Sequence, residues 1–146
     1  LIFFSALFVM VGGLEAAGVL ESIVSLLDGL SRIPPLWFGV SLIWIVAVLS
    51  AVVDNIPITI ALIPVIRGLG ETGMDITPLW WALAFGAGFG GNGTIIGSTA
   101  NIIVASLSEK TRTPITSRLW NRRGLPAMLL TCAIASLLYI VFYETF

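Results

Sequence analysis

The chain has 146 residues, of which 58% are hydrophobic and 10% are charged, and its mean hydropathy is +1.05. In soluble domains about a quarter of all residues are charged. This composition therefore excludes an ordinary water-soluble protein and indicates an integral membrane protein. The net charge of -1 identifies no partner, because the placement of charges in a membrane protein matters more than their sum. The sequence has no histidine and a single cysteine, Cys132, which excludes imidazole ligands and an intrachain disulfide.

The first apolar segment, residues 1–20, is about as long as one membrane-spanning helix. It begins without Met and without a basic leader, so we expect the interior of a longer polypeptide rather than a signal peptide. In residues 21–33, charged residues punctuate leucines at roughly helical spacing. This pattern predicts an amphipathic helix at the membrane interface, which ends at two prolines.

The second apolar segment, residues 36–67, is too long for one helical crossing and too short for two. Asp54 and Pro57 interrupt it near its middle. The interruption predicts a re-entrant helical hairpin, whose arms enter and leave on the same side of the membrane and whose tip lies at 54–57. Irregular backbone inside a bilayer has to be surrounded by protein or by a water-filled cavity. We therefore expect the tip to be enclosed.

The third apolar segment, residues 79–107, would be about 43 Å long as a single helix, which is longer than the bilayer requires. The sequence GFGGNGTIIGSTAN, residues 88–101, lies near its centre. We predict a transmembrane helix with a break at 90–94, near the bilayer midplane, and a return to helix near Ile95. A glycine stripe for close helix packing is the structural alternative. That stripe would consist of Gly86, Gly88, Gly90 and Gly97.

Basic residues gather in the loop that follows, residues 109–123. Five of the 7 Lys and Arg residues lie there, and the positive-inside rule makes this loop cytoplasmic. The hairpin would then open to the opposite side. The last apolar segment, residues 124–143, predicts a final transmembrane helix. The basic residues of the loop are Lys110, Arg112, Arg118, Arg122 and Arg123.

Asp54 is a carboxylate within an apolar segment, where ionisable residues are costly and mark ion pathways by default. The hairpin core contains no basic residue, so we expect Asp54 to be either protonated or occupied by a coupling cation. The competing interpretation is structural, because Asp54 or Asn55 followed by Pro57 is also typical of a capped helix start.

The polar residues after the break repeat at helical spacing. Thr94, Ser98 and Asn101 are separated by four and three positions, which predicts that they share one face of the resumed helix. Two interrupted segments also supply free helix N-termini for anions and unwound carbonyls for cations, as in the midplane sites of secondary transporters. We predict a solute-binding site there, without catalytic residues, in which the hairpin tip and the break lie within ~10 Å of each other. Its residues are Asp54, Asn55, Pro57, Gly91, Asn92, Gly93, Thr94, Ser98, Thr99 and Asn101.

Three stretches of the chain closely resemble the ion-transporter superfamily: FVMVGGLEAAGVLE, SAVVDNIPITIALIPVI and PLWWALAFGAGFGGNGTIIGSTANIIVASLSEK. The nearest branch is the family of arsenite permeases and pink-eyed-dilution (P) proteins, which is related to citrate transporters and divalent-anion/sodium symporters. Its members contain two inverted repeats, each with a re-entrant hairpin and a discontinuous helix. The chain is similar to the C-terminal repeat only. The resemblance therefore implies an all-α integral membrane fold with one such hairpin and one discontinuous transmembrane helix.

The resemblance also implies a function. It is that of the C-terminal half of a secondary active transporter for a small anion or anion-like solute, of the arsenite, dicarboxylate/citrate or chloride class, coupled to H⁺ or Na⁺. In the related symporters the corresponding tips and breaks hold sodium, which places an expected Na⁺ site near Asp54, Asn55, Asn92 and Thr94. Those relatives carry Ser-Asn-Thr at the hairpin tip, where this chain has Asp-Asn-Ile-Pro.

Two alternatives stay open at this point. One is a cation antiporter of the Na⁺/H⁺ type, in which Asp54 exchanges the proton, and the other is a non-transporting structural membrane subunit. The expected partners are membrane lipid, the missing N-terminal repeat and a second copy in a homodimer, but not nucleic acid. No cofactor besides the coupling ion is expected. A bacterial plasma membrane is the default location, and the likeness to P proteins makes an organelle membrane the alternative.

Overall fold

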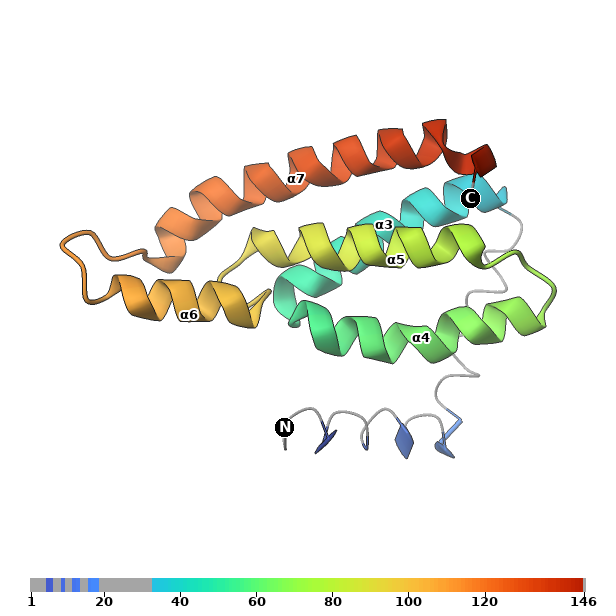
Figure 1. Ribbon diagram of the computed structural model, residues 1–146, viewed down its shortest axis with the longest axis horizontal. Coiled ribbons are helices and arrows are strands. Elements are labelled where there is room, and N and C mark those ends of the chain that lie inside the picture. The colour runs from blue at the N-terminus through green and yellow to red at the C-terminus, as the bar shows by residue number, and fades with distance from the viewer. Residues whose placement is uncertain (1–4, 7–8, 10–11, 14–15, 19–32, 146) are drawn as a thin grey trace.

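The structure is a computed structural model that describes residues 5–6, 9, 12–13, 16–18 and 33–145 (Figure 1). Every regular element within these ranges is helical, and none of them is a strand, so the architecture is all-α as predicted. The transmembrane helix expected at 1–20 falls largely outside the described residues. The interfacial helix expected at 21–33 falls almost wholly outside them.

Two helices, α3 (Pro35–Val52) and α4 (Asn55–Glu71), form a hairpin in which the chain reverses direction at Val53 and Asp54 (Figure 1). Proline in the first turn suits the start of α3, because its fixed φ angle is helical and its missing N–H is not needed there. Val53 ends α3 with extended backbone, φ -111° and ψ 133°. Asp54 then starts α4, since its Oδ1 accepts a hydrogen bond from the N–H of Ile56 at 3.1 Å.

The second arm of this hairpin, α4, extends beyond residue 67, where the sequence predicted the hairpin to end. Pro64 does not end α4, which continues through Arg67 to Glu71. The helix is followed by a turn at Gly73, where φ is +92°, a conformation that favours glycine. Leu69 in this added turn is buried in the core, whereas Arg67 and Glu71 are the charged residues at this end of α4.

The third apolar segment is interrupted in the structure. Helix α5 (Thr77–Gly90) is followed by a short 3₁₀ turn, η1 (Gly91–Gly93), and helical structure resumes as α6 (Thr99–Ser108). The return to helix is at Thr99 rather than near Ile95. The intervening residues 94–98 are held in a non-helical conformation, because the hydroxyl of Thr94 donates to the carbonyl of Ala51 at 2.5 Å and accepts from a nearby N–H.

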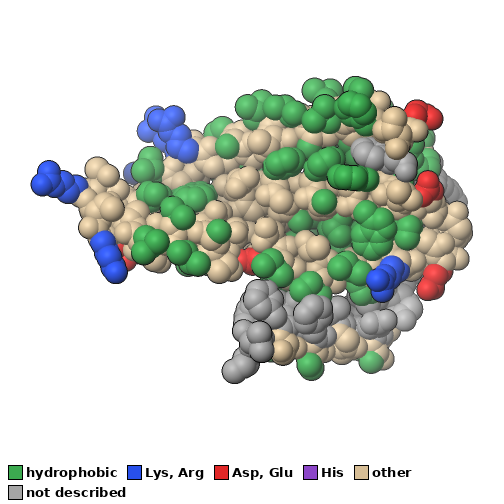
Figure 2. All heavy atoms as spheres, viewed as in Figure 1, with side chains coloured by type: hydrophobic (Ala, Val, Ile, Leu, Met, Phe, Trp, Pro, Cys, Tyr) green, Lys and Arg blue, Asp and Glu red, His purple; other side chains and the backbone are tan. Residues whose placement is uncertain are grey.

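The last helix, α7 (Ser117–Val141), begins inside the segment expected to be a basic loop, and a short turn, η2 (Tyr143–Thr145), follows it. The hydroxyl of Thr116 caps α7 by accepting a hydrogen bond from the N–H of Leu119 at 3.2 Å. Arg118, Arg122 and Arg123 therefore lie in the first two turns of a helix rather than in a loop. Figure 2 shows that Lys and Arg side chains gather at the end of the molecule where α6 and α7 meet, while most acidic side chains lie at the opposite end.

Close contact between α3 and α5 forms the centre of the fold. A Cβ atom added to Gly86 would lie 2.7 Å from the carbonyl oxygen of Ile43, and one added to Gly90 would strike the backbone of Ala47. The packing stripe predicted as an alternative is therefore real at Gly86 and Gly90. It does not extend to Gly88, whose added Cβ would have no atom of the described chain within 4 Å.

Within the residues that the structure describes, two helices are long and apolar enough to cross a membrane by themselves. These are α3, with 18 residues, and α7, with 25 residues. Many of their large apolar side chains are exposed, including Val48, Leu130 and Leu137 at 58%, 62% and 64%. Such surfaces are unfavourable in water and suit contact with lipid.

Candidate functional site

Four helix ends meet at the centre of the molecule: the C-termini of α3 and α5 and the N-termini of α4 and α6 (Figure 1). The hairpin turn and the break are in direct contact there. The hydroxyl of Thr94 in the break bonds to Ala51 at the end of α3, and the main chain of Thr99 bonds to Asp54 in the turn. Residues separated by more than 40 positions are thus brought within hydrogen-bond distance.

The carboxylate of Asp54 is the acceptor of three hydrogen bonds. Its Oδ1 accepts from the N–H of Ile56 at 3.1 Å, and its Oδ2 accepts from both the N–H and the hydroxyl of Thr99 at 2.5 Å each. Asp54 therefore caps α4, as the structural interpretation of the sequence predicted, and it also caps α6. Two helix N-termini carry partial positive charge toward this carboxylate. A negative charge on Asp54 would thus be stabilised by the two helix N-termini.

Two carbonyls of the break accept hydrogen bonds from within the chain. The side-chain amide of Asn101 donates to the carbonyls of Gly91 at 2.8 Å and Thr94 at 3.1 Å. Asn101 belongs to the first turn of α6 and points back to the break. The expectation that Thr94, Ser98 and Asn101 share one helical face is wrong, because Thr94 and Ser98 precede the helix.

Helix α7 also contributes to the site, and the sequence interpretation missed it. The indole Nε1 of Trp120 donates to the carbonyl of Asn92 at 3.1 Å, across a separation of 28 residues. A Cβ added to Gly124 would strike the same carbonyl, and one added to Gly93 would lie 2.6 Å from the sulfur of Met128. The sequence does contain a pattern that could have pointed to α7. Trp120, Gly124 and Met128 are spaced four residues apart, which places them on one face of a helix.

The remaining predicted residues differ in their surroundings. Gly91 and Gly93 are buried, whereas Asn92 is exposed. Ser98 occupies the N-cap position of α6, but its side chain makes no capping hydrogen bond. Pro57 is half-buried in the first turn of α4.

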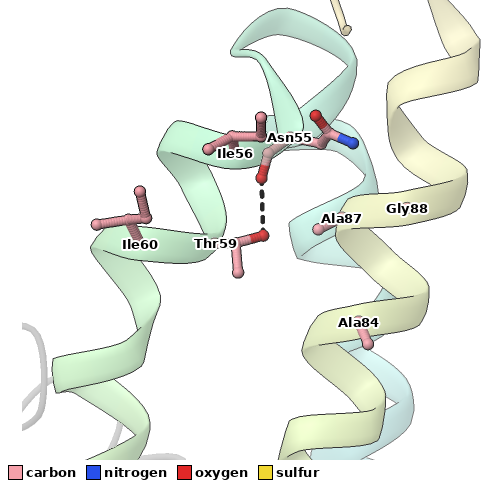
Figure 3. A pocket seen from close by; sticks show the side chains of 7 residues that line it. All are labelled: Asn55, Ile56, Thr59, Ile60, Ala84, Ala87 and Gly88. Carbon is pink, nitrogen blue, oxygen red and sulfur yellow. Dashed lines mark hydrogen bonds between the residues drawn. The ribbon is translucent and has the colours of Figure 1, made fainter. Parts of the chain in front are cut away.

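A cavity of about 300 Å³ lies between α4 and α5, beside the hairpin turn (Figure 3). Figure 3 shows the side chain of Asn55 pointing toward α5, with Thr59 one turn further along α4 and donating to the Asn55 carbonyl at 2.7 Å. The walls described for this cavity include no charged side chain. It is lined by Asn55, Ile56, Thr59, Ile60, Ala84, Ala87 and Gly88.

The ligands that this region could offer to a cation are oxygen atoms. No group of three His, Cys, Asp or Glu residues that could hold a metal occurs in the described part of the chain. The oxygens near the expected Na⁺ site belong instead to Asp54, to the carbonyls of the break and to Thr94, whose hydroxyl already donates to Ala51.

Comparison with known proteins identifies relatives of the chain. The family model for citrate transporters matches residues 1–86. The chain is 34% identical to an uncharacterized transporter from Synechocystis sp. over 94% of its length, and 35% identical to the P protein of Homo sapiens over 92%. It is 32% identical to a 46 kDa membrane protein of Mycobacterium leprae over 94%.

The chain is shorter than each of these relatives. The matches cover 34% of the Synechocystis protein, 17% of the human P protein and 33% of the Mycobacterium leprae protein. The chain therefore spans about a third or less of the length of these relatives. No solved structure matches it.

Proposed function

The chain belongs to the citrate transporter family, and from this premise we propose that it forms the C-terminal half of a secondary active transporter. Its family, its relatives and its composition make it an integral membrane protein. The proposed cargo is a small anion or anion-like solute, of the arsenite, dicarboxylate/citrate or chloride class, and H⁺ or Na⁺ is the proposed coupling ion.

The observation that carries this proposal is the meeting of α4 and α6 N-termini at the hairpin turn. Non-helical backbone is tolerated at membrane depth only where protein or water surrounds it, and transporters use such interrupted helices to bind solutes and ions. The turn at Val53–Asp54 and the irregular segment 94–98 are non-helical and touch each other. In this proposal they form a re-entrant tip and a discontinuous transmembrane helix around one binding region.

The polar groups available to the solute are weak ones. Asn55 offers a side-chain amide to the cavity between α4 and α5, and the cavity walls are otherwise mostly apolar. No Lys or Arg side chain is among the described residues that line this cavity, and the N-termini of α4 and α6 already face the carboxylate of Asp54. The solute would therefore bind through neutral polar groups such as the Asn55 amide, which suits an anion-like solute with little charge.

We also propose an orientation and partners. The basic end of the molecule, which includes the loop between α6 and α7, would face the cytoplasm, with a bacterial plasma membrane as the default. The exposed surface of helix α6 is an argument for a further partner that covers it, because Ser108 is the only buried residue of this helix. Lipid and the N-terminal repeat of the same transporter would cover the exposed side chains of Ile102, Ile103 and Leu107, and two copies would form a homodimer.

A flux assay tests the proposal. The full-length protein is reconstituted in liposomes, and uptake of arsenite, citrate, a dicarboxylate and chloride is measured with an imposed pH or sodium gradient, against protein-free liposomes. We expect uptake of one anion class that depends on one of the gradients. Na⁺/H⁺ exchange that needs no anion would replace the proposal by the antiporter alternative. A protein that moves none of these ions would contradict transport altogether.

A further inference from the structure

One carboxylate in this structure caps two helices that belong to different segments of the chain. We propose that Asp54 and Thr99 act as a positioning pair, named here the Asp54–Thr99 clasp, which fixes the second half of the interrupted helix to the hairpin. The role in transport rests on the proposed function, whereas the clasp itself is a property of the fold.

The geometry of the clasp is specific to these two residues. Thr99 is the first residue of α6, and both its N–H and its hydroxyl donate to Oδ2 of Asp54. The second carboxylate oxygen is engaged with Ile56 in the first turn of α4. One carboxylate thus holds the first residue of α6 through its main chain and its side chain, and the first turn of α4 through its main chain.

The helix that receives this cap lacks one of its own. Ser98 stands at the N-cap position with extended backbone, φ -155° and ψ 138°, yet its side chain does not cap α6. A cap from Ser98 would depend on α6 alone. A cap from Asp54, 45 residues away, makes the position of α6 depend on the hairpin.

Between the described residues, few other contacts could fix the start of α6. The only buried residue of this helix is Ser108, at its far end. Besides the clasp, Asn101 anchors the first turn through its bonds to Gly91 and Thr94, which themselves belong to the interrupted segment. The clasp is thus the contact that links the start of α6 directly to the hairpin turn. Asp54 acts in this way on the binding region through Thr99, without having to exchange an ion itself.

Hydrogen exchange of the full-length protein in lipid nanodiscs tests the clasp without any transported solute. The variants are Asp54→Asn, Thr99→Val, which keeps the branched shape but removes the hydroxyl, and Thr99→Ser, which keeps the hydroxyl. We expect exchange in the peptide that covers the start of α6 to rise about tenfold or more in the first two variants, and far less in Thr99→Ser. Thr131→Val is the matched control, because its hydroxyl bonds only within α7. Unchanged exchange in both Asp54→Asn and Thr99→Val would overturn the clasp.

Uptake by the same variants tests whether the clasp serves transport. We expect a loss of about tenfold in Thr99→Val and about a hundredfold in Asp54→Asn, and the double variant should be no worse than Asp54→Asn, because both changes break one unit. Losses that multiply would overturn the pairing. So would normal uptake by Thr99→Val together with a complete loss of gradient dependence in Asp54→Asn, which would make Asp54 an ion-exchanging group. If the unaltered protein moves no solute, the proposed function fails, and hydrogen exchange alone still decides on the clasp.

Discussion

Trp120 on α7 donates its indole N–H to the main-chain carbonyl of Asn92, at 3.1 Å, in the 3₁₀ turn that interrupts the third apolar segment. One turn further along α7, Gly124 allows the backbone of the helix to approach the same carbonyl. The interrupted segment is therefore supported from two sides, by Asp54 of the hairpin and by Trp120 of the last helix.

Trp120→Phe should destabilise the protein by about 1 kcal/mol, because it removes this hydrogen bond and keeps an aromatic ring. Thermal unfolding of the full-length protein in detergent measures the effect. Trp37→Phe, on the exposed first turn of α3, is the control and should change the unfolding temperature much less. Equal effects of the two substitutions would argue that Trp120 acts only through its bulk.

Gly88 and Gly90 occupy the same helix but should respond differently to alanine. Gly90→Ala forces a methyl group into the backbone of Ala47 and should destabilise the protein by about 1–3 kcal/mol. Gly88→Ala has free space and should stabilise the protein by about 0.5–1 kcal/mol, since alanine is the better helix residue. Thermal unfolding compares the two variants.

Gly88→Leu should reduce solute uptake while leaving the fold intact, because Gly88 lines the cavity. If Gly88→Leu transports normally, the cavity is not on the solute path.

Asn101→Asp should damage the break more than Asn101→Leu. Leucine removes two hydrogen bonds, which amounts to about 2 kcal/mol. Aspartate would in addition turn a negative oxygen toward the carbonyls of Gly91 and Thr94. Unfolding and uptake are measured beside Asn121→Asp, an exposed position on α7. A milder effect of aspartate than of leucine would show that the carboxylate finds a cation or a proton at this place.

Ser50→Ala tests a buried contact between α3 and α5. The hydroxyl of Ser50 is fully buried and donates to the carbonyl of Ala87 at 2.8 Å. Its loss should cost about 1 kcal/mol of stability. Ser136 provides the matched control, because its buried hydroxyl donates at the same distance to Cys132 within its own helix. Ser136→Ala should have the smaller effect on the unfolding temperature, and the reverse order would contradict a helix-joining role for Ser50.

Cysteine labelling tests the proposed orientation. Thr113→Cys lies in the exposed loop between α6 and α7, and Glu71→Cys lies at the opposite end of the molecule. A membrane-impermeant maleimide should label Thr113→Cys only from the cytoplasmic side and Glu71→Cys only from the other. The native Cys132 is buried, so the unaltered protein serves as the unlabelled control. Labelling of both positions from one side would contradict the topology.

Local chemistry accounts for where the helices are interrupted. Asp54 precedes a proline in the first turn of α4, and the glycines of η1 are poor helix residues. These features depend on neighbours within a few positions, so one sequence is enough to predict an interruption at each place. The start of α6 is different. The sequence predicted a return to helix near Ile95, directly after the glycines, whereas in the structure α6 starts at Thr99 and its cap comes from Asp54, far away in the sequence.

Contacts between distant segments account for the other residues that the sequence interpretation missed. Trp120 was not assigned to the site, because its partner is a main-chain carbonyl in an irregular segment 28 residues earlier. Gly88 was grouped with the packing glycines, since its spacing from Gly86 and Gly90 does not reveal which neighbour faces it. The neighbour of a helix face is a tertiary property. Spacing identifies the face but not what lies opposite.

The contact of α5 with the backbone of α3 has a consequence for motion. Gly86 and Gly90 bring the backbones of α3 and α5 so close that sliding of one helix past the other would cause a clash, so we expect α3 and α5 to move as one body. We expect rotation to occur at the non-helical joints, at Val53–Asp54 on one side and residues 94–98 on the other. The two arms beyond these hinges, α4 and α6, share the carboxylate of Asp54. Either arm must therefore carry the other with it, or first break the bonds that join them.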